Sequence, residues 1–141
     1  MQQAQKLGLK VKIIAGDEAC TPQFIKLAGS SMNNDTYCTL AGVPPAKMPQ
    51  GPEFFKRYQQ RFGVPVQLYA PYAYDAVLAM ADAMQAAGST DPKVYLPKLR
   101  ASKLGGVTGA IQFDEKGDIR NGAITVRQFD QGNWTDKSVV R

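Results

Sequence analysis

Residues 9–29 read LKVKIIAGDEACTPQFIKLAG, and this stretch decides the fold class. Its first seven residues alternate between apolar and polar and then become continuously apolar, which predicts a β-strand that ends at Gly16. Thr21 supplies a hydroxyl group for a helix N-cap and Pro22 suits the first helical position, so we expect a short helix that ends at Gly29. A strand, a loop and a helix in succession indicate an α/β fold.

The rest of the chain continues this alternation. Hydrophobic periodicity and glycine or proline boundaries predict helices over 2–7, 52–62, 74–87 and 92–99, and strands over 35–40, 110–113 and 123–129. The sequence also indicates an extended proline-rich linker over 42–51, an aromatic loop over 64–74 and a turn over 131–133. Four short strands are fewer than a doubly wound sheet normally has, and the first helix lacks an N-cap, so we expect part of the fold to be missing from this chain.

Composition narrows the class of protein. The chain has 141 residues, of which 44% are hydrophobic and 21% charged, and this balance is typical of a folded domain. No apolar run approaches the roughly 18 residues that a membrane-spanning helix needs. Histidine is absent, which excludes a Ser-His-Asp triad, a Cys-His pair and an HExxH zinc site. The sequence also lacks the GxGxxG and GxxxxGK motifs, so we expect no nucleotide and no other cofactor.

Seventeen Lys and Arg residues against twelve Asp and Glu residues give a net charge of +5. One hypothesis is therefore a basic interaction module that binds an anionic partner. The expected helix over 52–62 would present both the basic residues Lys56, Arg57 and Arg61 and an aromatic face. That face consists of Phe54, Phe55, Tyr58 and Phe62. The charge is scattered, however, and no run of five like charges exists, which favours a solvated surface over a nucleic-acid footprint.

The only two cysteines are Cys20 and Cys38, which lie 18 positions apart. This spacing matches neither a CxxC redox pair nor a set of zinc ligands. Both cysteines lie near the ends of expected strands, and the spacing alone leaves a disulfide and two buried thiols equally open. A thiol oxidoreductase that uses Cys20 is a further hypothesis, which free and reactive thiols would support.

Four pieces of the sequence, in this order, resemble one family of proteins. They are GDEACT at 16–21, FIKLAG at 24–29, AYDAV at 73–77 and FDEKGD at 113–118. Their order and spacing are similar to the C-terminal portion of the leucine/isoleucine/valine-binding proteins of bacterial ABC importers, which have the type I periplasmic binding fold. Each piece alone has low specificity, and their combination carries the resemblance.

The resemblance implies a partial type I fold, with incomplete doubly wound sheets flanked by helices. Residues 1–42 would finish the C-terminal lobe, residues 43–122 would hold a hinge crossing and the second segment of the N-terminal lobe, and residues 123–141 would return to the C-terminal lobe. The implied function is not catalytic. It is the binding of branched-chain or similar aliphatic amino acids by cleft closure in the periplasm, with delivery to an ABC permease. We expect the signal peptide to be lost with the missing N-terminal part.

An amino-acid ligand requires an acid for its ammonium group, donors for its carboxylate and apolar walls for its side chain. The resemblance places the acid at Asp17, which follows an expected strand, and the adjacent Glu18 is the alternative. It places an aromatic wall at Tyr74, with Tyr72 as a weaker candidate. Without the resemblance, the acids would be interpreted as a solvated loop and Tyr74 as a core residue.

The resemblance also implies a disulfide between Cys20 and Cys38, since many relatives have a cysteine pair. In that family the donors for the ligand carboxylate come from early N-terminal-lobe segments, which this sequence does not contain. We therefore expect weak or no binding by the chain alone, or a swapped homodimer in which a second copy supplies the missing wall.

Overall fold

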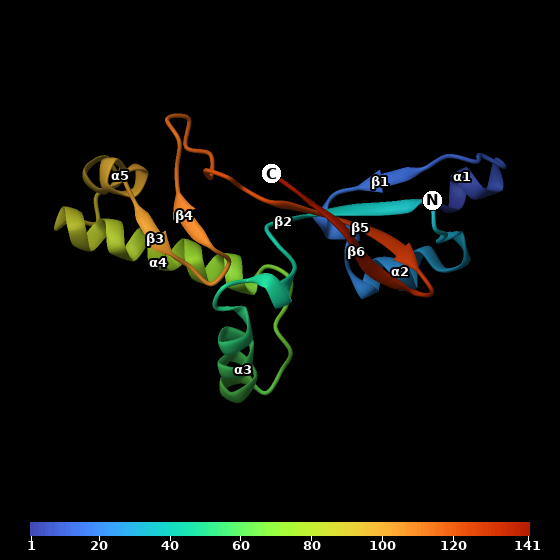
Figure 1. Cartoon of the computed structure of the whole chain (residues 1–141), viewed down its shortest axis with the longest axis horizontal. Coiled ribbons are helices and arrows are strands. Elements are labelled where there is room, and N and C mark those ends of the chain that lie inside the picture. The colour runs from blue at the N-terminus through green and yellow to red at the C-terminus, as the bar shows by residue number, and fades with distance from the viewer. The chain divides into compact units, whose positions relative to one another are not determined.

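The computed structural model describes all residues, 1–141, and divides into two compact units (Figure 1). Residues 1–44 and 122–141 form the first, which we call the sheet unit. Residues 45–121 form the second, which we call the helix unit. The structure confirms the expected mixture of helices and strands, and each unit is described by itself.

The sheet unit contains a four-stranded sheet with the order β1-β2-β5-β6. These strands are β1 (Ile13–Ala15), β2 (Thr36–Ala41), β5 (Ile124–Asp130) and β6 (Asn133–Val140). Strand β1 pairs with β2 in parallel, whereas the β2–β5 and β5–β6 pairs are antiparallel. Because β2 and β5 lie on either side of residues 45–121 in the sequence, the sheet joins residues that are far apart in the chain (Figure 1).

Two short α-helices and two 3₁₀ turns complete the sheet unit. They are α1 (Gln2–Lys6), η1 (Asp17–Ala19), α2 (Pro22–Ala28) and η2 (Gly29–Ser31). The Thr21 hydroxyl caps α2 by accepting the N–H of Phe24 at 3.2 Å, as the sequence predicts. Alternate residues Thr36, Cys38 and Leu40 of β2 are buried, whereas Ile14 of the neighbouring β1 is 73% exposed. The sheet therefore has its core on one face, as the period of two in a strand requires.

The helix unit contains three α-helices and a two-stranded sheet. Its elements are η3 (Pro45–Lys47), α3 (Gly51–Phe62), α4 (Ala70–Ala87), α5 (Pro92–Arg100), β3 (Lys103–Gly105) and β4 (Ala110–Gln112). Strands β3 and β4 pair antiparallel through the 106–109 turn. Helices α3 and α4 each end at a glycine with positive φ, Gly63 and Gly88, where a residue with a side chain would be strained. Asp91 caps α5 by accepting the N–H of Lys93.

Four details of the predicted elements were wrong. The segment predicted as an extended linker over 42–51 contains the 3₁₀ turn η3, and its last residue, Gly51, begins α3. Helix α4 begins at Ala70, so the end of the predicted aromatic loop is helical; Pro71 lies in the first turn, where its missing N–H has no intrahelical partner to lose. The strand predicted over 9–15 forms only at 13–15, because its partner β2 begins opposite Ile13. Strands β3 and β6 were not predicted. Strand β3 (KLG) has one apolar residue before the glycines at 105 and 106, and β6 carries charged residues in its middle, so neither shows a clear alternation.

No helix of the chain is both long enough and apolar enough to cross a membrane.

Candidate functional site

The candidate acids lie in a tight turn at the carboxyl end of β1. Gly16 continues the extended backbone of the strand, and the 3₁₀ turn η1 then holds Asp17 and Glu18. The N–H of Ala19 donates to the carbonyl of Gly16 at 3.2 Å, which closes the turn. Asp17 is half-buried, Glu18 is exposed, and Ala19 is 1% exposed. The hydrogen bond of the turn and the burial of Ala19 thus both hold the backbone of Asp17 and Glu18 in place.

Glu18 folds back over Gly16. A Cβ atom placed on Gly16 would lie 2.7 Å from Oε2 of Glu18, which is closer than nonbonded atoms approach. The absence of a side chain at Gly16 therefore leaves room for the Glu18 carboxylate beside the end of β1. Asp17 and Glu18 both remain candidates for binding an ammonium group.

A disulfide between Cys20 and Cys38 fixes this turn to the neighbouring strand. Cys20 follows η1, and Cys38 of β2 is opposite Ala15 in the β1–β2 register. The two Cα atoms are 5.6 Å apart, and both residues are buried. The structure thus contains the implied disulfide, and it has no free thiol for the hypothesis of a thiol oxidoreductase at Cys20.

The candidate tyrosines both lie on α4, in the helix unit, and they face different ways. Residues two positions apart on an α-helix are separated by about 200° around its axis. Tyr74 is 42% exposed, and its ring packs on Phe54 of α3 with 5.2 Å between centroids. Tyr72 is half-buried; burial, first, and the charge of Asp75, second, raise its pKa above the ordinary value. Tyr74 and Tyr72 therefore belong to different faces of α4.

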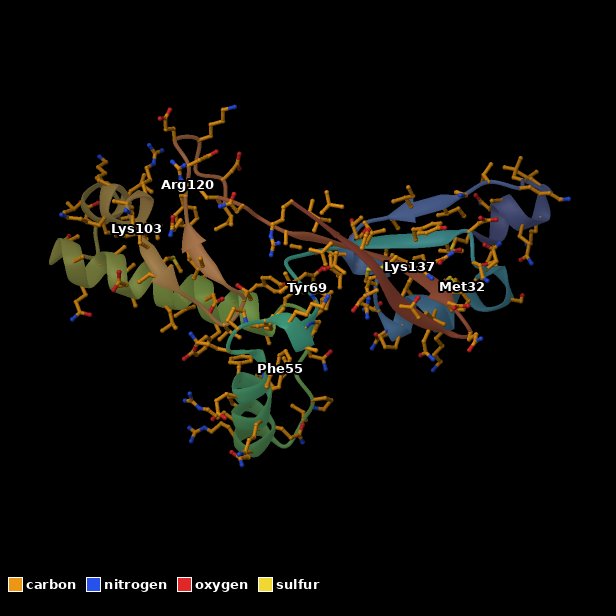
Figure 2. The ribbon with its side chains drawn as sticks, viewed as in Figure 1. Met32, Phe55, Tyr69, Lys103, Arg120 and Lys137 are labelled. Carbon is orange, nitrogen blue, oxygen red and sulfur yellow. A yellow bond between two sulfur atoms is a disulfide. The ribbon has the colours of Figure 1, made fainter.

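The aromatic face predicted on α3 is present. The rings of Phe54, Tyr58 and Phe62 form a row with centroid separations of 5.9 and 4.7 Å, and Phe55 stands edge-on to Phe54 at 6.0 Å. Figure 2 labels Phe55 on this helix. The row joins Tyr74 through Phe54, so it extends the aromatic surface of α4 onto α3.

Sequence reasoning missed Asp75, although it lies in the AYDAV piece that carries the resemblance. Its side chain is 4% exposed and accepts three hydrogen bonds. Oδ1 accepts the N–H of Val107 at 2.8 Å, and Oδ2 accepts the N–H of Thr108 at 2.8 Å and the Thr108 hydroxyl at 2.6 Å. Helix α4 carries two acids, Asp75 and Asp82, and only Asp75 is buried, with Ala79 and Ala83. Because residues seven positions apart lie on nearly the same face of a helix, no pattern in the sequence distinguishes the two acids.

The remaining acids do not form a metal site. No group of three or more His, Cys, Asp or Glu side chains is placed to hold a metal ion. The DEKGD segment at 114–118 is a turn: Oδ1 of Asp114 accepts the N–H groups of Lys116 and Asp118, both at 2.9 Å. The bond from Asp118 is the main reason that the pKa of Asp114 lies below its ordinary value.

The sequence has known relatives among amino-acid-binding proteins. The Leu/Ile/Val-binding protein homolog 1 of Brucella suis biovar 1 is 29% identical over 133 residues, which are 94% of this chain and 35% of that protein. The leucine-, isoleucine-, valine-, threonine-, and alanine-binding protein of Pseudomonas aeruginosa is 27% identical over 131 residues, 92% of this chain and 34% of that protein. The chain thus spans about a third of the length of these curated relatives.

Solved structures show the same relationship. The leucine binding protein LivK of Thermotoga maritima matches with a TM-score of 0.80 and 27% identity, over 98% of this chain and 39% of that one. The isoleucine complex of LivJ from Streptococcus pneumoniae matches with a TM-score of 0.75 at 21% identity, over 98% of this chain and 39% of that one, and shows the shared fold.

These matches confirm the expected partial type I periplasmic binding fold. A family model described as "Periplasmic binding protein" matches residues 1–133. This match covers nearly the whole chain, and the chain therefore belongs to the periplasmic binding protein family.

Proposed function

We propose that this chain forms part of the ligand site of a solute-binding protein that serves an ABC importer for branched-chain or similar aliphatic amino acids. Its relatives are named for the binding of leucine, isoleucine and valine. The observation that carries the proposal is the placement of Asp17 and Glu18 directly after β1, on a turn that the Cys20–Cys38 disulfide fixes. Ligands of open α/β sheets bind beyond the carboxyl ends of such strands.

The proposed roles follow from the chemistry of an amino acid. Asp17, or Glu18 beside it, accepts charge-assisted hydrogen bonds from the ammonium group. Tyr74 provides an aromatic wall for the aliphatic side chain, since its ring is partly exposed and is supported from behind by Phe54. Tyr72 is half-buried on another face of α4, so we rank it below Tyr74.

The two units correspond, in this proposal, to segments of two lobes. Residues 1–42 and 123–141 belong to the C-terminal lobe, and residues 43–122 to a hinge crossing and the N-terminal lobe. The ligand is bound by cleft closure in the periplasm and passed to a membrane permease without covalent chemistry. The chain alone binds weakly, and a swapped homodimer is one way in which a second copy completes the site.

Ligand-detected NMR on the 141-residue chain tests the proposal, because saturation transfer is sensitive to millimolar binding. We expect attenuation of the leucine, isoleucine and valine signals, and little for glutamate or urea. The double substitution Asp17→Asn with Glu18→Gln removes both candidate charges and is expected to abolish the attenuation. Asp35→Asn is the matched control, because Asp35 is an exposed acid of the same unit that lies outside the turn.

Two results would contradict the proposal. Equal attenuation for all the compounds would show that the chain has no preference for aliphatic amino acids, and an equal loss in the Asp35→Asn control would remove the role of the turn. Binding of an oligonucleotide that falls steeply with salt would instead support the alternative, a basic interaction module. Lys56, Arg57 and Arg61 of α3 are exposed and would be its first candidates.

A further inference from the structure

The 105–108 segment of the helix unit is hydrogen-bonded both to α4 and to Gln50, the residue before α3. Asp75 of α4 binds the backbone N–H groups of Val107 and Thr108, as described above. From the other side, the side-chain amide of Gln50 donates to the carbonyl of Gly105 at 3.3 Å, and the backbone N–H of Gln50 donates to the carbonyl of Val107 at 3.5 Å. We call this segment, with Gln50 and Asp75, the junction.

Gly106 makes the junction possible. A Cβ atom on Gly106 would lie 2.5 Å from Oδ2 and 2.8 Å from Oδ1 of Asp75, so any side chain there would displace the carboxylate. A Cβ atom on the adjacent Gly105 would meet nothing within 4 Å. The need for glycine is therefore specific to the position that faces Asp75, and the two glycines provide a matched pair for an experiment.

The junction fixes both partners of the Phe54–Tyr74 ring contact. Gln50 precedes α3, and Phe54 lies one turn into that helix. Tyr74 is the residue before Asp75 on α4. Because both helices are hydrogen-bonded to the same short segment, the distance between the two rings depends on that segment staying in place.

We propose that Asp75 is a positioning residue that, by holding the 105–108 segment against α4, fixes the ring of Tyr74 on Phe54. The proposed function makes Tyr74 a wall of the ligand site, and the relevance of this inference to ligand binding rests on that role. A buried carboxylate could instead contribute only to stability, which is the interpretation that the test has to separate.

The first arm of the test uses no ligand. NMR of the chain measures amide exchange at Val107 and Thr108, contacts between the Tyr74 and Phe54 rings, and the titration of Tyr72. For Gly106→Ala we expect amide exchange at least about tenfold faster and loss of the ring contacts, because charge-assisted hydrogen bonds are broken. Gly105→Ala is expected to change neither. In an Asp75→Ala background, Gly106→Ala is expected to add no further change.

A milder pair guards against a variant that fails to fold. Thr108→Val removes only the hydroxyl donor to Oδ2 of Asp75, and Thr108→Ser keeps it. We expect faster exchange and weaker ring contacts in Thr108→Val, with rescue in Thr108→Ser. Asp75→Asn is expected to lower the pKa of Tyr72 toward its ordinary value, since the carboxylate charge contributes to raising it.

Ring contacts that survive in Asp75→Asn and Gly106→Ala, while the amides exchange faster, would overturn the positioning role and leave a purely structural one. The second arm repeats the leucine attenuation with Thr108→Val and Thr108→Ser. Reduced attenuation only in Thr108→Val supports the proposal, and equal attenuation in both overturns its relevance to the ligand. If the unaltered chain gives no leucine attenuation, the proposed weak binding by the chain alone fails, and the ligand-free arm still decides the role of Asp75.

Discussion

The sheet unit and the helix unit hold their candidate ligand residues by different chemistry. In the sheet unit, a covalent bond between Cys20 and Cys38 fixes the turn that carries Asp17 and Glu18. In the helix unit, three hydrogen bonds to the buried Asp75 hold the segment of α4 that carries Tyr74. The first device is independent of neighbouring side chains, whereas the second works only while water is excluded from the carboxylate.

Core composition explains why both devices are needed. The largest fully buried side chains of the whole chain are Thr36, Thr125 and Cys38, all of the sheet unit and all small. In the helix unit, the buried hydrophobic side chains are few: Met48, Ala79, Ala83, Val107 and Ile111. Apolar burial of this size stabilises a small unit only weakly, so specific bonds carry a larger share of its stability.

Removal of the disulfide is expected to have the largest effect and to be confined to the sheet unit. Replacing both cysteines by serine releases a loop of 18 residues, which costs about 3 kcal/mol in unfolding free energy. Hydrogen exchange should show β2 amides losing protection while α4 amides keep theirs. Chemical reduction of the unaltered chain is the control, and equal loss of protection in α4 would contradict independent stabilisation of the units.

The substitution Gly51→Ala is expected to destabilise the helix unit, as loss of the disulfide destabilises the sheet unit. A Cβ atom there would lie 2.7 Å from the carbonyl oxygen of Pro45 and 2.8 Å from Cβ of Met48, and overpacking of this kind costs about 1–3 kcal/mol. We expect faster exchange in α3 and unchanged exchange in β2. Gly105→Ala is the control, because a Cβ atom there would meet nothing within 4 Å. A similar loss of stability in that variant would show that the effect of Gly51→Ala is not steric.

Each unit has one helix whose N-terminus is capped by a side chain, so the stabilisation by a cap can be compared between the two units. Thr21→Ala removes the cap of α2 and Asp91→Ala that of α5, and each is expected to cost about 1 kcal/mol. Urea unfolding followed by exchange of the amides of each helix measures both losses. Thr21→Ser and Asp91→Asn retain a capping oxygen and should stay close to the unaltered chain. A loss several times larger in one unit would show that its helix contributes more to the shared core.

The Arg127–Asp136 ion pair across β5 and β6 should have the smallest effect. Nε of Arg127 lies 2.7 Å from Oδ1 of Asp136, with side chains 23% and 40% exposed, and partly exposed pairs contribute about 0.2–1 kcal/mol. Asp136→Asn is therefore expected to lower stability slightly, with a difference that disappears in 1 M salt as screening increases. A salt-independent loss would indicate that the hydrogen bond, and not the charge, is responsible.

Elements with local signals could be predicted from the sequence. Thr21 and Pro22 mark the start of α2, and Gly63 marks the end of α3, because caps act within a few residues. Strands β3 and β6 could not be predicted in the same way. Each depends on a partner strand, and β6 carries Asp136 and Lys137 in its middle, which hide the alternation expected of a strand.

The candidate site shows the same limit. Asp17 and Glu18 stand out because they follow an apolar strand, and the resemblance then gives them a role. The spacing of Cys20 and Cys38 left the disulfide open, since it forms only when β1 and β2 pair in register. The role of Asp75 was hidden because its hydrogen-bond donors lie 32 and 33 residues further along the chain.

The pairing of β2 with β5 has a consequence for how the chain folds. Residues 45–121 intervene between these two strands, and the N–H of Gly42 donates to the carbonyl of Ala123 at 2.6 Å, so the chain leaves and re-enters the sheet unit at one place. While those residues are unfolded, joining the strands requires closure of a long flexible loop, which carries a large entropic cost. Early folding of the inserted residues removes most of that cost, so refolding should proceed from the insertion to the sheet, with β2–β5 pairing as the later kinetic phase.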